Sequence, residues 1–120
     1  MDTLKLCESE YRFATIVWDN EPITSGELVT LCNEYLGWKK STTYTVLKKL
    51  CERRILINEN SKVHSLVKKE QVQKYESEQF ISRSFGGSLP QFLTAFMGDK
   101  KISKQEAEKL KKIIDSYKED

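Results

Sequence analysis

The chain has 120 residues, of which 38% are hydrophobic and 32% charged, and its formal net charge is +2. This length supports one domain, or one domain with an appendage, and cannot bury two independent cores. No apolar run approaches the ~18 residues of a membrane span, and the N-terminus lacks the form of a signal peptide, so we expect a cytoplasmic protein without membrane insertion.

Two helices are expected before residue 38. The first covers residues 7–19, where one face is apolar: Tyr11, Ala14, Val17 and Trp18. Asn20-Glu21-Pro22 ends it, because a proline disfavours helix in the residue before it. Thr24-Ser-Gly-Glu27 has the form of a capping box and predicts a second helix that ends near Gly37. Its inward side chains are expected to be Leu28, Leu31, Cys32 and Tyr35.

The charge of the chain is unevenly distributed. Residues 38–69 hold nine Lys or Arg against two acids, a net charge of +7, whereas residues 1–37 have a net charge of −5 and residues 70–120 of zero. Such a local excess indicates a polyanionic partner.

A third helix is predicted inside this basic stretch. At 100° per residue one side is mostly apolar and suits a core contact: Thr43, Val46, Leu47, Leu50 and Arg54. The opposite side has hydroxyls and then cations, with Tyr44 at its margin: Ser41, Thr42, Thr45, Lys48, Lys49 and Glu52. Short hydroxyl side chains allow close approach to a duplex, and both hydroxyls and lysines can contact phosphates or base edges. From the helix alone, a merely solvated face is an equally good interpretation.

The residues after this helix favour DNA binding. Ile55–Ile57 and Val63–Val67 predict two short strands around a polar turn at residues 58–62, which is a basic-tipped hairpin. Three helices followed by such a hairpin predict a winged helix-turn-helix whose third helix enters the major groove. The expected fold is therefore mainly α with a small β-hairpin wing, and residues 1–69 form the DNA-binding domain.

Residues 70–120 predict a C-terminal three-helix dimerisation region. A polar helix over 70–85 ends at Gly86-Gly87, Pro90 opens a short apolar helix that ends at Gly98-Asp99, and Ser103 caps the last helix. That last helix has a clean apolar stripe: Ala107, Leu110, Ile113, Ile114 and Tyr117. These helices have little core of their own, so burial against a second copy is favoured over folding back onto the N-terminal domain.

Other chemistry finds little support. The lone histidine, His64, lies in the predicted wing, and no phosphate loop, nucleophile elbow or H-E-x-x-H motif occurs, so we expect no enzyme. The three cysteines, Cys7, Cys32 and Cys51, form no C-x-x-C pair, which argues against a disulfide framework or a thiolate metal site. We expect no metal or other cofactor, and we interpret Cys32 and Cys51 as small buried side chains.

The chain resembles the penicillinase and methicillin-resistance repressor family (the BlaI/MecI/CopY type) over nearly its whole length. The resemblance rests on the order and spacing of several motifs: L-C-E-S-E-Y, E-P-I-T-S-G-E-L-V, G-W, S-T-T-Y-T-V-L-K-K-L, F-G-G-S-L-P-Q-F-L-T-A-F and I-S-K-Q-E-A-E-K-L-K-K-I-I-D. It implies a dimeric winged-helix repressor that binds a palindromic double-stranded DNA operator, often of β-lactamase genes.

The resemblance also implies roles for particular residues. DNA contacts would be made by Ser41, Thr42, Tyr44 and Thr45, and phosphate contacts by Lys48, Lys49 and Lys62. Dimerisation would use the C-terminal apolar side chains: Phe92, Phe96, Leu110, Ile113, Ile114 and Tyr117. In antibiotic-responsive members a membrane sensor metalloprotease leads to cleavage before a phenylalanine in the short apolar helix, and the matching bond here is Ala95–Phe96.

Four features depart from the family pattern. Cys7 stands where a threonine usually caps the first helix, and Arg54 stands where a glycine usually follows the third. The wing is short and lacks the usual aromatic residue. The paired C-terminal cysteines of copper-responsive members are missing, which argues against copper sensing.

Two alternatives remain open from the sequence. One is a repressor of the same fold that answers another signal, such as a metal or stress. The other is a winged-helix module that binds protein and not DNA, which would show no duplex affinity near physiological salt.

Overall fold

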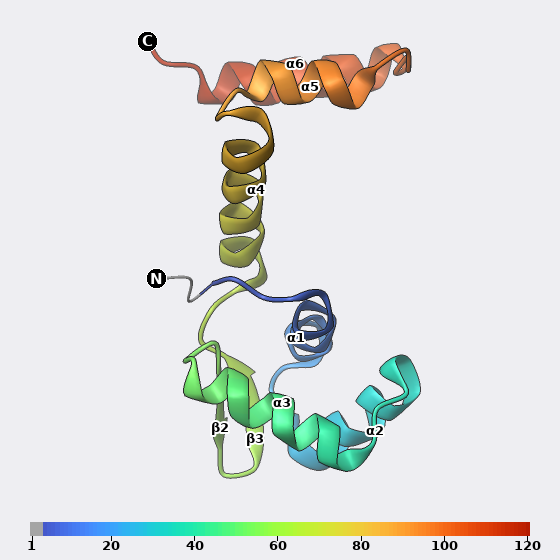
Figure 1. The fold of residues 1–120 in the computed structure, drawn as a ribbon, viewed down its shortest axis with the longest axis vertical. Coiled ribbons are helices and arrows are strands. Elements are labelled where there is room, and N and C mark those ends of the chain that lie inside the picture. Colours follow the sequence, from blue (N-terminus) through green and yellow to red (C-terminus); the bar gives the residue numbers. More distant parts are fainter. Residues whose placement is uncertain (1–3) are drawn as a thin grey trace. The chain divides into compact units, whose positions relative to one another are not determined.

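The fold is known from a computed structural model, which describes residues 4–120. The described residues form six helices and three short strands (Figure 1). The helices are α1 Glu8–Asn20, α2 Ser25–Leu36, α3 Lys40–Glu52, α4 Lys69–Phe85, α5 Leu89–Met97 and α6 Lys104–Tyr117. The strands are β1 Ile23–Thr24, β2 Leu56–Glu59 and β3 Lys62–Ser65. The predicted class, a mainly helical winged helix with C-terminal helices, is confirmed.

The ends of the first two helices follow from their local sequence. The Thr24 hydroxyl accepts a hydrogen bond from the Glu27 N–H at 3.1 Å, and the Glu27 carboxylate accepts one from the Thr24 N–H at 3.3 Å, so the predicted capping box is confirmed. Gly37 ends α2 in the left-handed region, with φ +69°. At the start of α1, the Glu10 carboxylate accepts a hydrogen bond from the Cys7 N–H at 3.0 Å.

Helix α3 ends in a Schellman motif. The Ile55 N–H donates to the Leu50 carbonyl and the Arg54 N–H to the Cys51 carbonyl, both at 3.0 Å. This motif requires a left-handed backbone at the position that Arg54 occupies, and Arg54 has φ +62°. The placement of Arg54 on the apolar face of the third helix was wrong, because the helix ends at Glu52 and Arg54 is exposed.

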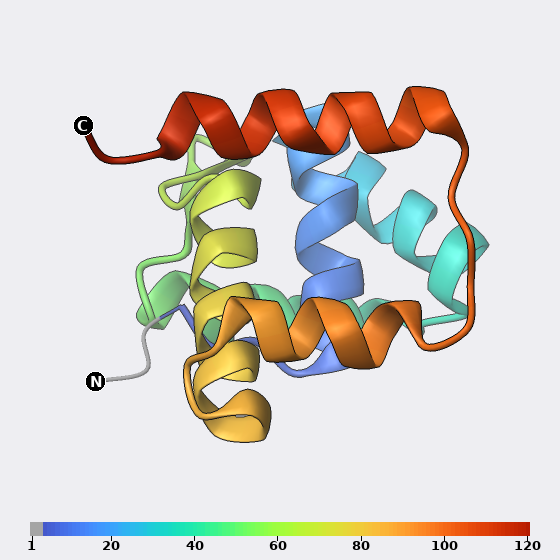
Figure 2. The ribbon, with the colours of Figure 1, turned by 90° about the horizontal axis from the view of Figure 1, so that it is seen from above.

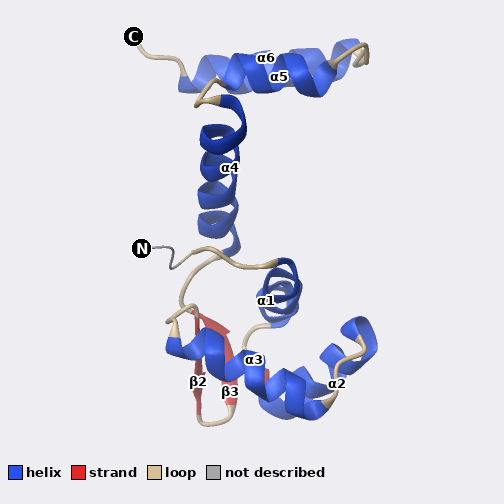
Figure 3. Ribbon diagram, in the orientation of Figure 1, coloured by secondary structure: helices blue, strands red, loops and turns tan. Residues whose placement is uncertain are grey.

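The wing is part of a three-stranded antiparallel sheet in the order β1-β3-β2 (Figure 3). Leu56 pairs with Ser65 and Glu59 with Lys62, which leaves a two-residue turn of Asn60 and Ser61, both with positive φ. The predicted five-residue turn was too long, because its outer residues belong to the strands. Strand β1 was not predicted; its two residues form a strand only by pairing with β3.

The core lies among α1, α2, α3 and the sheet. Its largest fully buried side chains include Phe13, Leu28, Leu50, Ile55 and Val63. The Trp18 indole N–H donates to the Val67 carbonyl at 3.0 Å, which links α1 to the segment that follows the wing. This N-terminal core therefore fixes α3 and the wing against the same two helices.

One inward prediction in α2 was wrong. Tyr35 is 68% exposed, whereas Leu28 and Cys32 are fully buried. The reason is that Trp38, just beyond the helix, stacks on Phe13 with ring centroids 5.6 Å apart and covers this end of the core. Cys51, which we also expected to be buried, is only half-buried.

Contacts divide the chain into two compact units, one ending at Phe80 and the other Ile81–Asp120. The first turns of α4 belong to the first unit because Val72 is part of its core. Our functional division between residues 69 and 70 stays a prediction.

In the second unit, α5 and α6 run in opposite directions and are joined by residues 98–103 (Figure 2). As predicted, Pro90 lies in the first turn of α5 and Ser103 caps α6.

Candidate nucleic-acid interface

The outward face of α3 is a row of hydroxyls followed by a lysine. Ser41, Thr42, Thr45 and Lys48 are all exposed, while Thr43 and Leu47 on the opposite face are buried. The predicted division of this helix into a core face and an outer face is confirmed for these residues. We call the exposed set Ser41, Thr42, Tyr44, Thr45 and Lys48 the hydroxyl-lysine face.

The side chains of this face are partly fixed by the helix itself. The Thr45 hydroxyl donates to the Ser41 carbonyl at 2.9 Å, which leaves its oxygen lone pairs facing solvent as acceptors. The Lys40 ammonium lies 5.9 Å from the centroid of the Tyr44 ring. Lys40 was missing from our predicted contacts; it was visible in the basic run, but only the position of the helix start shows that it shares the first turn with this face.

Lys49 differs from its neighbour Lys48. Its ammonium lies 2.9 Å from Glu10 Oε2, and the side chain of Glu10 is only 8% exposed. The Arg53 guanidinium lies 3.3 Å from the other oxygen of the same carboxylate. A phosphate contact by Lys49 stays a prediction, and this pairing argues against it.

Burial acts to raise the pKa of Glu10, but the hydrogen bonds from the Cys7 N–H and from Lys49 outweigh it. The pKa of this carboxyl therefore lies below its ordinary value, and Glu10 is ionised at neutral pH. No local sequence signal identifies this pair, because its members are 39 residues apart in the chain.

The tip of the wing is polar and has one cation. Lys62 is exposed and lies opposite Glu59 on β2 and Thr24 on β1. The Ser25 N–H donates to the Ser61 carbonyl at 3.0 Å, so the tip is tied to the start of α2. The hairpin is therefore held in place on the side of β1, and Lys62 projects from a supported strand.

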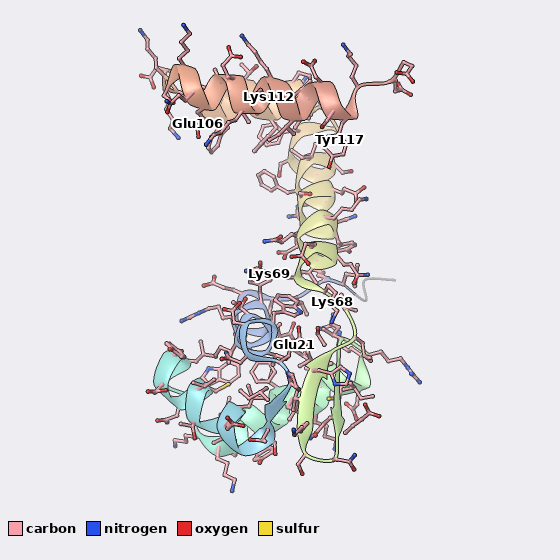
Figure 4. All side chains as sticks on the ribbon, turned by 180° about the vertical axis from the view of Figure 1, so that it is seen from behind. Glu21, Lys68, Lys69, Glu106, Lys112 and Tyr117 are labelled. Carbon is pink, nitrogen blue, oxygen red and sulfur yellow. The ribbon has the colours of Figure 1, made fainter. Side chains whose placement is uncertain are left out.

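The base of the wing is held by a cluster that sequence reasoning missed. Glu21 Oε1 accepts hydrogen bonds from the Ser65 N–H at 2.7 Å and from the Ser65 hydroxyl at 2.8 Å. Lys68 donates to the Ser65 hydroxyl at 3.2 Å and lies 4.0 Å from Glu21, where β3 leads toward α4 (Figure 4). These contacts join the end of α1 to the end of the hairpin.

The C-terminal helices present apolar side chains that their own unit leaves exposed. No residue of α5 or α6 is buried. Exposed positions include all four predicted on α6: Leu110, Ile113, Ile114 and Tyr117. On α5, the ring of Phe96 stacks on that of Phe92 at 5.9 Å, and the Lys100 ammonium lies 4.6 Å from the Phe96 centroid. The Ala95–Phe96 bond lies in the last turn of α5.

No helix within residues 4–120 is long and apolar enough to cross a membrane. No cluster of three or more His, Cys, Asp or Glu side chains in this part of the chain could hold a metal ion.

Comparisons with known proteins agree with this architecture. A profile of the penicillinase repressor family matches residues 6–116. The methicillin resistance regulatory protein MecI of Staphylococcus aureus (strain Mu50 / ATCC 700699) is 20% identical over 116 residues, which cover 93% of this chain and 94% of that protein. The chain belongs to the penicillinase repressor family and is a transcriptional repressor, not an enzyme.

Proposed function

We propose that the protein is a homodimeric repressor that binds a palindromic operator through the hydroxyl-lysine face of α3 and the wing. The observation that carries the proposal is the exposed face itself, in which short hydroxyl side chains lie beside a cation on α3. Helix α3 is the second helix of the helix-turn-helix formed with α2, and the chain belongs to a repressor family. Small side chains at Ser41, Thr42 and Thr45 let the helix approach base edges. The hydroxyls of Ser41 and Thr42 can both donate and accept, and that of Thr45, which donates to the Ser41 carbonyl, can accept.

Phosphate contacts fall to the cations at the edge of this face. Lys48 follows the hydroxyls by about one turn, and Lys62 projects from the wing. Tyr44, with its hydroxyl group and with Lys40 above its ring, is suited to a sugar or phosphate contact. These contacts set the register of the repressor on the duplex, while the hydroxyls read the sequence.

The second copy covers the apolar side chains of α5 and α6. A soluble chain gains free energy by burying a contiguous apolar stripe, and Leu110, Ile113, Ile114 and Tyr117 recur at the spacing of one helix face. Two linked DNA-binding units engage two half-sites at once, so the dimer binds far more tightly than one unit alone. The same two-fold symmetry gives the operator its palindromic form.

The regulated genes are proposed to include β-lactam resistance genes, in line with the name of the staphylococcal relative. Relief of repression would follow cleavage at Ala95–Phe96 by a membrane sensor metalloprotease. Supporting this, α5 has only nine residues, so few helical hydrogen bonds have to open before a protease can reach the bond. Cleavage there would separate α6 from the DNA-binding unit and thereby weaken the dimer.

Footprinting of the DNA upstream of the chain's own gene tests operator binding. We expect two protected half-sites related by two-fold symmetry, with their centres separated by a whole number of helical turns. A single protected half-site would contradict the two-fold symmetric dimer. No protection even at high protein concentration would contradict DNA binding and favour a protein-binding module.

Cleavage is tested separately, by incubating the repressor with the protease domain of its sensor and determining the fragment masses. The expected product ends at Ala95. An intact chain, or a cut at another bond, removes proteolytic relief from the proposal and leaves DNA binding unaffected.

A further inference from the structure

Glu10 lies on α1, beside the helix α3 that is proposed to bind DNA, and it binds three groups at once. Its Oε2 lies 2.9 Å from the Lys49 ammonium, and its Oε1 accepts from Arg53 at 3.3 Å and from the Cys7 N–H at 3.0 Å. Arg53 in turn donates to the Lys5 carbonyl. One carboxylate thus joins the N-terminal segment, α1 and the C-terminal end of α3.

The partners of Glu10 differ in exposure. The side chain of Glu10 is nearly buried, while that of Lys49 is 61% exposed. A carboxylate taken out of water needs its cations, so it holds them more firmly than an exposed carboxylate does. Lys48, one residue earlier, is exposed and forms no ion pair within residues 4–120. Adjacent lysines on one helix therefore present different net charges to a polyanion.

We propose that Glu10 is a positioning residue that also masks the charge of Lys49, so that of the two adjacent lysines only Lys48 is offered to DNA unpaired, and the affinity of α3 for unrelated sequences stays low. This inference rests on the proposed DNA-binding function. Non-specific affinity comes almost entirely from cations that neutralise phosphates, whereas base-edge contacts do not depend on them. Masking one cation therefore lowers the affinity for unrelated sequences and leaves the base-edge contacts in place.

The test is the salt dependence of binding to a fluorescent duplex of unrelated sequence, measured by anisotropy over a potassium chloride series. Each lysine that neutralises a phosphate adds about −0.9 to the slope of log affinity against log salt concentration. Glu10→Gln keeps the shape of the side chain but removes its charge, so the slope should steepen by about 0.9 through the freed Lys49. In the double variant Glu10→Gln/Lys49→Gln the slope should return to that of the wild type.

Two single variants test the mask without disturbing Glu10. Lys49→Gln should leave the slope unchanged, whereas the matched control Lys48→Gln should flatten it by about 0.9. Equal flattening by both lysine variants would overturn the proposal. So would a Glu10→Gln slope equal to that of the wild type, or a steepening that persists in the double variant.

The same experiment separates this inference from the proposed function. If the wild-type protein shows no salt-dependent binding to any duplex, DNA binding itself fails and the mask fails with it. If the wild type binds with a measurable slope, only the pattern among the four variants decides about Glu10.

Discussion

Arg54 occupies a backbone position that is suited to glycine, and replacing it should stabilise the protein. The residue has φ +62° at the end of α3. Hydrogen bonds on both sides fix this conformation, because the N–H groups of Arg54 and Ile55 bind the carbonyls of Cys51 and Leu50. Leu50 and Ile55 are both fully buried, so the turn cannot relax without opening the core.

The magnitude follows from two opposing effects. A non-glycine residue in the left-handed region costs roughly 1–2 kcal/mol relative to the right-handed region. Glycine removes that strain but has more freedom in the unfolded chain, which costs about 0.5–1 kcal/mol. We expect Arg54→Gly to raise the free energy of unfolding by about 0.5–1 kcal/mol, or Tm by about 2–5 °C.

The matched control is Arg54→Ala, which removes the guanidinium but keeps a Cβ and hence the strain. Urea unfolding followed by the fluorescence of Trp18 and Trp38 reports on the first unit, and the protein concentration must be equal for all variants because a dimer gains stability with concentration. The reasoning is refuted if the glycine variant is no more stable than the alanine variant.

Three further predictions concern the dimer, the buried carboxylate and the thiols. Ile114→Asp places a charge on the apolar face of α6 and should convert the proposed dimer to monomer in sedimentation equilibrium; a dimer that persists would exclude this face. Because the pKa of Glu10 is depressed in the folded state, the ionised carboxylate contributes stability that is complete above its unfolded pKa of about 4.3 and is lost as pH falls through the folded pKa. On acidification, the urea midpoint of Glu10→Gln should therefore fall less than that of the wild type. Parallel profiles of urea midpoint against pH would contradict this. Exposed Cys7 should react first with a thiol reagent, while burial protects Cys32 and raises the pKa values of both Cys32 and Cys51; three equal rates in the native protein would contradict the structure.

Much of the fold could be predicted because its signals are local. The Thr24 box, the Gly37 stop, the Gly86-Gly87 break and the Ser103 cap act within a few residues of the chain, and each was placed correctly. The outer face of α3 was also predictable, since helical periodicity alone separates exposed from buried positions.

The features that were missed depend on partners distant in sequence. Strand β1 exists only because Ile23 pairs with Val63, and Tyr35 is exposed because Trp38 covers the core in its place. Glu10 and Lys49 are 39 residues apart in the sequence. No local pattern distinguishes Lys48 from Lys49; their difference comes from the packing of α1 against α3.

Two adjacent parts of the interface are thus held by carboxylates from α1 and the loop after it. Glu10 holds the end of α3, and Glu21 holds Ser65 at the base of the wing. Two of the seven acids in residues 1–37 therefore fix elements of the candidate interface in place.

The most direct test of the account is fluorescence anisotropy of the purified protein with a duplex from upstream of its own gene, over a salt series and against unrelated competitor DNA. The account predicts tight binding that resists the competitor, with two chains per duplex and a steep loss of affinity with salt. Weak binding that disappears near physiological salt, or equal affinity for operator and competitor, would contradict the claim that this chain is a sequence-specific DNA-binding repressor.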